Sequence, residues 1–208
     1  MSEPNSDFIS IIVLAAGLST RFGRNKLMEP MGGGTMIEQV VSESLKSKAS
    51  QVIVVCGHEH DRVKDALRNY RCEVVFNEDY KKGQSFSFRK GLSWVDKDAD
   101  AVMVIPGDVA GVDHSMINAV IDEYSGSYAP IVTAGFRGHS GHPILFDKNL
   151  FGELAKIDEE TRGLKSVVSR HRSQVRLVET SEAALLDIDK QGDIARLAAV
   201  SKGVPEKP

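Results

Sequence analysis

The segment spanning residues 14–26 combines small residues with two cations, a composition that suits a polyphosphate-binding loop. Residues 15–17 are alanine, alanine and glycine, and such short side chains let backbone N–H groups approach a ligand closely. Consecutive exposed amides form a concavity that binds anions. Arg21 and Lys26 add two positive charges to the same loop, and a triphosphate carries about four negative charges when ionised. The segment therefore predicts a site for a nucleoside triphosphate.

Two other phosphate-binding loops are excluded by their spacing. A P-loop requires G-x-x-x-x-G-K-[ST], whereas five residues separate Gly17 from Gly23 and no lysine follows Gly23. The dinucleotide fingerprint G-x-G-x-x-G is also missing from this segment. For these residues taken alone, a glycine-rich turn with solvated basic side chains remains an alternative.

A second candidate is the carboxylate of Asp108, which closely follows an apolar run at residues 101–105. The preceding Gly107 keeps the turn open. Mg²⁺ is commonly held by one or two carboxylates together with phosphate oxygens and water, so an acid at the end of a central strand suits this ion. An aspartate that only caps the next turn is the alternative interpretation.

Short apolar segments precede these candidates and are expected to be strands. They are rich in valine and isoleucine, which indicates strands covered on both faces of a largely parallel sheet, and they comprise residues 8–14, 52–56, 73–76, 101–105 and 131–134. Apolar residues three and four apart predict helices at residues 36–46, 59–69, 85–95 and 115–124. Thr35 and Glu38 form a possible capping box at the start of the first helix.

This alternation predicts an α/β fold, a three-layer α/β/α sandwich with a Rossmann-like, mostly parallel sheet. Ligands in such sheets bind outside the carboxyl ends of the strands. The polyphosphate loop and Asp108 each follow a strand, so we expect them at one edge of the sheet. Gly83 and Ser85 open the helix after the third strand, where free N–H groups would face the crevice, or they only cap that helix.

Length and composition favour one ordinary globular domain. The chain has 208 residues, of which 41% are hydrophobic and 26% charged, and we expect a single domain over residues 1–208 with polar tails at 1–7 and 202–208. The net charge of −3 gives no basic field, so we expect neither nucleic acid nor a membrane as partner. No apolar run approaches the roughly 20 residues that span a bilayer. The N-terminal residues lack the pattern of a signal peptide, and we expect a cytoplasmic protein.

The first loop resembles the signature of the nucleotidyltransferases that attach CMP or GMP to molybdopterin. That signature, L-A-A-G-x-S-x-R-x-G-x-x-K, is matched at each specified position by Leu14, Ala15, Ala16, Gly17, Ser19, Arg21, Gly23 and Lys26. The resemblance implies that this loop wraps the triphosphate, with Arg21 and Lys26 as catalytic cations. Members with Ala-Ala-Gly tend to use CTP, whereas versions with more glycine tend to use GTP. The resemblance therefore favours CTP over GTP.

Later segments extend this resemblance to the nucleotide and metal sites. An N-x5-G-x3-S segment of the family contacts the base and ribose and is similar to residues 77–87, which implies that Asn77 and Gly83 bind the nucleotide, together with Ser85 at the opening of the helix. The family's G-D-M-P turn implies Asp108 as a catalytic Mg²⁺ ligand, although this chain reads G-D-V-A. Its D-I-D-T-P-E-D-L ending is similar to residues 187–194 and implies Asp189 as a second metal ligand, with Lys-Gln replacing Thr-Pro. Ordinary acids at a helix N-terminus are the alternative for this last segment.

The acceptor half of the resemblance is less specific. The G-H-P element at residues 141–143 implies that His142 lines the pterin pocket, and a T-R-G-L-K segment implies that Arg162 meets an anionic acceptor. A structural histidine before a rigid proline is equally open for His142. The histidine pairs 58/60 and 139/142 lack a third ligand of suitable spacing, so we interpret them as exposed loop histidines and not as metal sites.

The resemblance implies Mg²⁺-dependent transfer of a nucleoside monophosphate to molybdopterin, with pyrophosphate released and a molybdoenzyme as a possible client. Two alternatives stay open. One keeps the chemistry and changes the acceptor to a sugar or polyol phosphate. The other is an accessory protein that binds CTP and delivers the cofactor without catalysis, which the departures at Ala110 and at residues 190–191 motivate.

Overall fold

A computed structural model describes residues 7–20, 22–188 and 193 of the chain. In this part, seven strands form one sheet in the order β5-β4-β1-β6-β8-β7-β9. Their bounds are β1 Ile9–Ala15, β4 Gln51–Cys56, β5 Glu73–Phe76, β6 Ala101–Pro106, β7 Ile131–Phe136, β8 His139–Asp147 and β9 Val175–Glu179. Strand β8 pairs antiparallel with both β6 and β7, and the other pairings within this sheet are parallel. The predicted mostly parallel sheet is confirmed.

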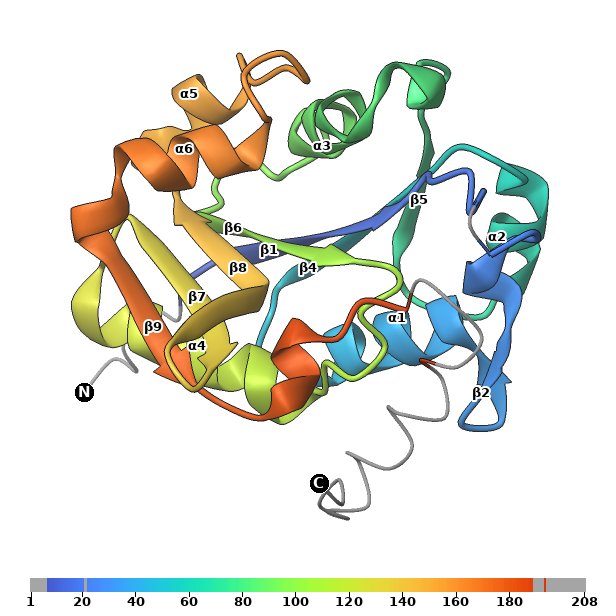
Figure 1. Ribbon diagram of the computed structural model, residues 1–208, viewed down its shortest axis with the longest axis horizontal. Helices are drawn as coiled ribbons and strands as arrows, with labels where there is room; N and C mark the ends of the chain where they lie inside the picture. Colours follow the sequence, from blue (N-terminus) through green and yellow to red (C-terminus); the bar gives the residue numbers. More distant parts are fainter. Residues whose placement is uncertain (1–6, 21, 189–192, 194–208) are drawn as a thin grey trace.

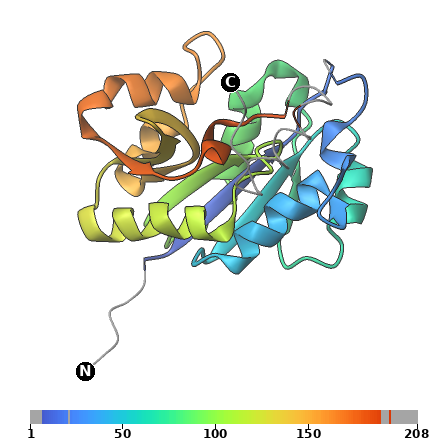
Figure 2. The ribbon, with the colours of Figure 1, turned by 60° about the horizontal axis from the view of Figure 1, so that its bottom comes forward.

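Helices cover both faces of the sheet, as Figures 1 and 2 show. One face carries α1 Met36–Lys46, α2 His60–Ala66 and α4 His114–Ser127, and the other carries α3 Gln84–Leu92, α5 Phe151–Leu154 and α6 Leu164–Arg170. A two-stranded sheet of β2 Pro30–Met31 and β3 Gly34–Thr35 precedes α1. Short 3₁₀ helices occupy Lys26–Met28, Tyr80–Lys82, Lys148–Leu150, Arg172–Gln174 and Glu182–Leu185. Among the residues described, no helix has both the length and the apolar character that crossing a bilayer requires.

Strand β1 lies within the core, and its sequence is apolar at every position except Ser10, whose hydroxyl donates to Gln51 Oε1 at 2.7 Å. Its seven residues are all buried. Ile9, Ile11 and Val13 pack with the helices of one face, whereas Ile12 and Leu14 pack with those of the other. Because successive side chains of a strand point to opposite faces, a strand buried between two helical layers needs apolar residues on both of its faces. The three-layer sandwich is confirmed.

Helix α1 begins where its capping signal predicts. The Thr35 hydroxyl accepts a hydrogen bond from the backbone N–H of Glu38, and the Glu38 carboxylate accepts one from the backbone N–H of Thr35 at 2.7 Å. Helices α2 and α3 both end three residues before their predicted ends, at Ala66 and Leu92. Past β7, the chain also forms β8, α5, α6 and β9, which the sequence did not predict.

A buried acid joins α1 to α4 and gives the fold a pH-dependent contact. The side chain of Glu43, which is 9% exposed, accepts hydrogen bonds from Lys46 Nζ at 2.7 Å and from the backbone N–H of His114 at 3.0 Å, and its carboxylate contacts His114 Nδ1 at 2.7 Å. Burial opposes ionisation of this carboxyl, but the hydrogen bonds outweigh burial and lower its pKa from 4.5 to about 2.

Replacing Glu43 with glutamine is expected to lower the free energy of unfolding at pH 7 by about 1–3 kcal/mol. A carboxyl whose pKa is depressed on folding stabilises the fold above its unfolded pKa, and this contribution is lost as the pH falls from 4.5 towards about 2. The difference between wild type and Glu43→Gln should therefore shrink between about pH 5 and pH 2, the window that these two pKa values define. Urea unfolding at several pH values measures it. Asp122→Asn, which removes an exposed ion pair with Lys48, is the control and should change little.

Candidate active site

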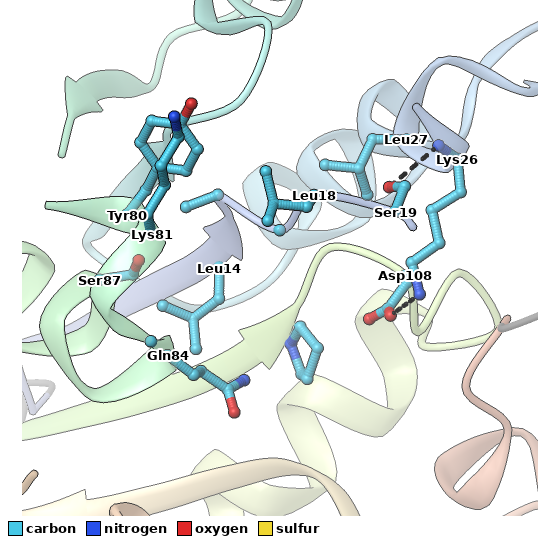
Figure 3. Close-up of a pocket in the computed structure, with 14 residues that line it drawn as sticks. Leu14, Leu18, Ser19, Lys26, Leu27, Tyr80, Lys81, Gln84, Ser87 and Asp108 are labelled. Carbon is cyan, nitrogen blue, oxygen red and sulfur yellow. Dashed lines mark hydrogen bonds and ion pairs between the residues drawn. The ribbon is translucent and has the colours of Figure 1, made fainter. Parts of the chain in front are cut away.

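A cavity of about 320 Å³ opens at the carboxyl ends of β1 and β6, beside the start of α3 (Figure 3). Sequence-predicted site residues contribute half of its lining, namely Leu14, Ala16, Gly17, Ser19, Lys26, Gly83 and Asp108. The other lining residues were not predicted as site residues, although Gln84 and Ser87 belong to the predicted segment 77–87; they are Leu18, Leu27, Tyr80, Lys81, Gln84, Ser87 and Pro106. The cavity is thus built from the strand ends at which the α/β architecture places ligands.

The loop after β1 turns back on itself around Ser19. This residue adopts a left-handed backbone conformation with φ 50°, and its carbonyl accepts hydrogen bonds from the N–H groups of Phe22 and Gly23 at 3.0 and 3.2 Å. Its hydroxyl accepts another from the backbone N–H of Lys26 at 3.3 Å. Ser19 therefore connects the small residues at the start of the loop to the lysine at its end. The predicted Arg21, in the same loop, lies outside the described residues.

Asn25 fixes the backbone that carries Lys26, a role that sequence reasoning missed. Its side chain is buried, and Oδ1 accepts a hydrogen bond from the backbone N–H of Leu27 at 3.2 Å. This contact caps the 3₁₀ helix that begins at Lys26. The Asn25 amide also donates to Glu59 Oε2 at 3.3 Å. The sequence signal that could have revealed this role is the preference of asparagine for helix N-caps.

Lys26 and Asp108 both line the cavity and form an ion pair with each other (Figure 3). The two side chains are 15% and 21% exposed, so the pair is shielded from bulk water without being closed off. Lys26 Nζ also donates to the backbone carbonyl of Ile188 at 2.9 Å. The N–H of Ile188 donates in turn to the carbonyl of Asp108 at 3.2 Å. Three segments far apart in the sequence therefore meet at one charged pair.

The turn that carries Asp108 is held by burial, although it lacks the proline of the family's pattern. Val109 and Ala110 are both buried, and the N–H of Val109 donates to the carbonyl of Pro106 at 3.1 Å. On the other side, the N–H of Gly107 donates to the carbonyl of Leu14 at 2.9 Å, and a Cβ on Gly107 would lie only 3.1 Å from that oxygen. Packing and these contacts supply the rigidity for which a proline was expected.

The donor set at Asp108 fits Mg²⁺ when phosphate oxygens complete it. Among the residues that the structure describes, no group of three or more histidine, cysteine, aspartate or glutamate side chains is placed to hold a metal. Mg²⁺ does not need such a group, because it usually takes one or two carboxylates with substrate phosphates and water. Asp108 supplies one carboxylate in the cavity. Asp189, the predicted second ligand, directly follows the anchored Ile188 but lies outside the described residues.

Three residues predicted to bind nucleotide are buried behind the cavity surface. Ala15 is 1% exposed and packs in the core. The amide of Asn77 donates to Ser87 Oγ at 3.0 Å, and its Oδ1 accepts from the backbone N–H of Asp79 at 3.1 Å. Ser85 is 3% exposed, and the residues on either side of it along the cavity wall are Gln84 and Ser87. Asn77 therefore braces the wall from which Ser87 reaches the cavity.

Gly57, after β4, allows Tyr80 to close one side of the cavity. A Cβ at this position would overlap the Tyr80 side chain and would lie 3.0 Å from the backbone oxygen of Ala16. Both neighbours line the cavity. The absence of a side chain at residue 57 is therefore a requirement of the site and not only of the turn.

Replacing Gly57 with alanine is expected to weaken nucleoside triphosphate binding about tenfold and to lower the free energy of unfolding by about 1–3 kcal/mol, because Tyr80 must move to relieve the overlap. Isothermal titration with CTP and urea unfolding measure the two effects. Gly126→Ala is the matched control, since Gly126 lies in α4 with open space around it and alanine should stabilise that helix. Unchanged binding in Gly57→Ala would contradict the role given to Tyr80.

His142 lies within β8 and is half-buried, which corrects the prediction that it is an exposed loop histidine. It precedes a cis bond to Pro143, and among the residues that the structure describes its shielded Nδ1 has no hydrogen-bond partner. Burial lowers the pKa of His142 below its usual value, and the charge of Asp108 opposes this shift. The prediction failed because residues 139–140, the polar beginning of β8, pair with β7 and bring this segment into the sheet.

Arg162 lies in the connection between α5 and α6. Its side chain is exposed, and its backbone adopts the left-handed conformation with φ 68°. This connection reaches towards the start of α3 in Figure 1, on the same side of the sheet. Neither Arg162 nor His142 lines the cavity around Lys26 and Asp108. Their predicted contact with an acceptor stays a prediction.

Comparison with known proteins relates this site to nucleotidyltransferases. Among curated proteins, the bifunctional protein GlmU of Francisella tularensis subsp. novicida is 27% identical over 155 residues, which cover 73% of this chain and 33% of the relative. The chain thus spans about a third of the length of the curated relatives it matches. The crystal structure of Rv0371c from Mycobacterium tuberculosis H37Rv is similar with a TM-score of 0.81 and 27% identity, covering 93% of this chain and 98% of that chain.

A second structure of Rv0371c from Mycobacterium tuberculosis, in complex with manganese, matches with a TM-score of 0.76 and 26% identity and covers 91% of this chain and 97% of that one. The model of one protein family covers residues 11–175, which include the first loop, the Asp108 turn and His142. These residues supply the cavity and most of the sheet described above. The chain therefore belongs to the MobA-like NTP transferase domain family.

Proposed function

We propose that this protein transfers a nucleoside monophosphate, with CMP favoured, from a nucleoside triphosphate to the phosphate of molybdopterin in a Mg²⁺-dependent reaction that releases pyrophosphate. One observation carries the proposal. The loop after β1 and the turn after β6 bring Lys26 and Asp108 into contact inside one cavity, with small residues of the loop lining the same space. A cation, a carboxylate and close backbone approach are the groups that nucleotidyl transfer requires.

In the proposed reaction, a terminal phosphate oxygen of the acceptor forms a bond to the α-phosphorus while the bond from that phosphorus to the β-phosphate bridging oxygen breaks. The electron pair leaves with pyrophosphate. Catalysis of this kind depends on positioning and charge neutralisation and needs no covalent enzyme intermediate. Mg²⁺ held by Asp108, and by Asp189 if the family's pattern applies, would neutralise phosphate charge and orient the reacting oxygens.

The Lys26–Asp108 ion pair is expected to rearrange when the nucleoside triphosphate binds. Without ligand, each charge is neutralised by the other. A triphosphate offers Lys26 a more highly charged partner at the same place, and the lysine then stabilises the negative charge that builds on the leaving pyrophosphate. The contact of Lys26 with the Ile188 carbonyl keeps the ammonium group aimed at the cavity during this exchange.

Ala16 and His142 support the more specific parts of the proposal. Ala16 lines the cavity and, in place of glycine, narrows it, which favours a pyrimidine base and hence CTP. His142 presents a buried nitrogen without a partner in the described chain, close enough for the charge of Asp108 to act on it. A buried polar atom of this kind is satisfied when a substrate group bonds to it. The acceptor would therefore enter between β8 and the α5–α6 connection.

The deciding experiment measures pyrophosphate release from each of the four common nucleoside triphosphates with Mg²⁺ and molybdopterin. We expect release with CTP, weaker release with GTP, and none when EDTA is present or molybdopterin is omitted. Release only with a sugar or polyol phosphate in place of molybdopterin would keep the chemistry and replace the acceptor. Tight CTP binding without release under any of these conditions would contradict catalysis and favour the accessory role.

A further inference from the structure

The connection between α5 and α6 is hydrogen-bonded to the first turn of α3. Glu159 Oε1 accepts a hydrogen bond from the backbone N–H of Ser85 at 2.6 Å. A Cβ on Gly83 would overlap the Glu159 side chain, and one on Gly163 would lie 2.7 Å from Ser85 Oγ. The 158–163 loop therefore packs directly on the start of α3, and both views show it beside that helix (Figures 1 and 2).

A charge on α3 also acts on this loop. Arg89 lies four residues after Ser85, so the two side chains share one face of the helix, and the Arg89 guanidinium stacks on the Phe86 ring at 4.4 Å from the centroid. Hydrogen bonds from Thr161 lower the pKa of Asp158, and the positive charge of Arg89 lowers it further. The interaction between Arg89 and Asp158 is electrostatic, whereas Glu159 makes a direct hydrogen bond to α3.

The loop is also braced internally. The backbone N–H and the hydroxyl of Thr161 both donate to Asp158 Oδ1 at 2.7 Å, and the N–H of Gly163 donates to the carbonyl of Asp158 at 2.8 Å. A loop closed in this way is expected to move as a unit. The position of the loop relative to the cavity then depends on its contacts with α3. Among these, Glu159 makes a direct hydrogen bond to Ser85.

We propose that Glu159 is a positioning residue that holds the 158–163 loop against α3 and thereby sets the affinity for the acceptor. The inference rests on the proposed function. Gly83 and Gln84, at the start of α3, line the cavity, whereas Arg162 sits in the loop. By joining these two segments, Glu159 fixes the distance between the bound nucleotide and the exposed cation that meets an anionic acceptor.

The test compares Glu159→Ala, Glu159→Gln and Glu160→Ala in the full chain. Losing the hydrogen bond should raise the KM for the acceptor about tenfold, while kcat and the Kd for CTP stay within about twofold. Glutamine keeps an oxygen that can accept from Ser85 and should recover most of the acceptor affinity. Glu160, which is exposed as Glu159 is, is the matched control and should behave as wild type. Amide hydrogen exchange at Ser85 should be faster in Glu159→Ala than in the other proteins.

The outcomes separate this inference from the proposed function. Wild-type protein that transfers nothing to molybdopterin contradicts the proposed function, and the acceptor is then the phosphorylated compound to which wild type does transfer. An active wild type together with a normal acceptor KM in Glu159→Ala overturns the inference alone. So does an equal rise in KM in Glu160→Ala, or a change confined to CTP binding. If Glu159→Ala does not fold, the acceptor KM of Glu159→Gln and its amide exchange rate at Ser85 decide whether the inference holds.

Discussion

Replacing Lys26 with alanine is expected to lower turnover by about 10²–10³-fold. Lys26 lines the cavity with its ammonium group next to Asp108, and under the proposed function its charge stabilises the pyrophosphate that leaves. Alanine removes that charge without filling the space. Steady-state pyrophosphate release with saturating CTP and acceptor measures the change in kcat. Near-normal turnover would count heavily against the assignment of the phosphate site.

The control for Lys26→Ala is Lys81→Ala. Lys81 also lines the cavity, but its side chain is exposed and its ammonium group lies over the Tyr80 ring, 5.8 Å from the centroid. Its loss should lower turnover less than about tenfold, since an exposed charge is screened by solvent.

A Lys26→Ala/Asp108→Asn double variant separates the effect on folding from the effect on catalysis. It removes both partners of the ion pair and should unfold less readily than Lys26→Ala, which leaves a half-buried carboxylate unpaired.

Replacing Asp108 with asparagine is expected to lower turnover about 10³-fold, because under the proposed function this carboxylate holds the metal. The same change should leave binding of CTP without Mg²⁺ unchanged or tighter, since the carboxylate of Asp108 no longer competes with the phosphates for Lys26. A loss in kcat together with retained nucleotide affinity is specific to a carboxylate that acts in the reaction. Turnover and isothermal titration in EDTA measure the two quantities.

Asp122→Asn makes the same chemical change at an exposed position and should keep wild-type turnover. Titrating Mn²⁺ or Mg²⁺ against Asp108→Asn provides a second check, because a weakened metal site requires a higher ion concentration for the same rate. Turnover of Asp108→Asn within about tenfold of wild type would show that the carboxylate does not hold the essential metal.

The sequence predicted the nucleotide half of the fold better than the rest, for a physical reason. Strands β1, β4 and β6 are covered on both faces, so their apolar runs are conspicuous, and the loops that follow them meet at one edge. Lys26 and Asp108, which are 82 positions apart, could therefore be placed together from the order of strands. Their direct ion pair could not, because it depends on the turn of the loop at Ser19.

The acceptor half carries weaker local signals. Strand β9 lies at the edge of the sheet and exposes most of its residues, so it lacks an apolar run. Helix α5 has only four residues, too few for a helical period to emerge. Ile188 contacts Lys26 and Asp108 through its own backbone carbonyl and N–H, so these contacts leave no trace in the residue type at position 188. Asn25 and Glu159 were missed because their partners are backbone N–H groups, which every residue except proline offers.

Within the described sheet, β8 is the one strand that runs against its neighbours. Strand β6 carries Asp108 just beyond its end, whereas β8 carries His142 near its beginning, because the two run in opposite directions. Under the proposed function, residues 14–108 would set the donor nucleotide, and residues 139–188 could diverge to suit another acceptor. Evolution could then exchange the molecule that receives the nucleotide while the groups that activate it stay constant.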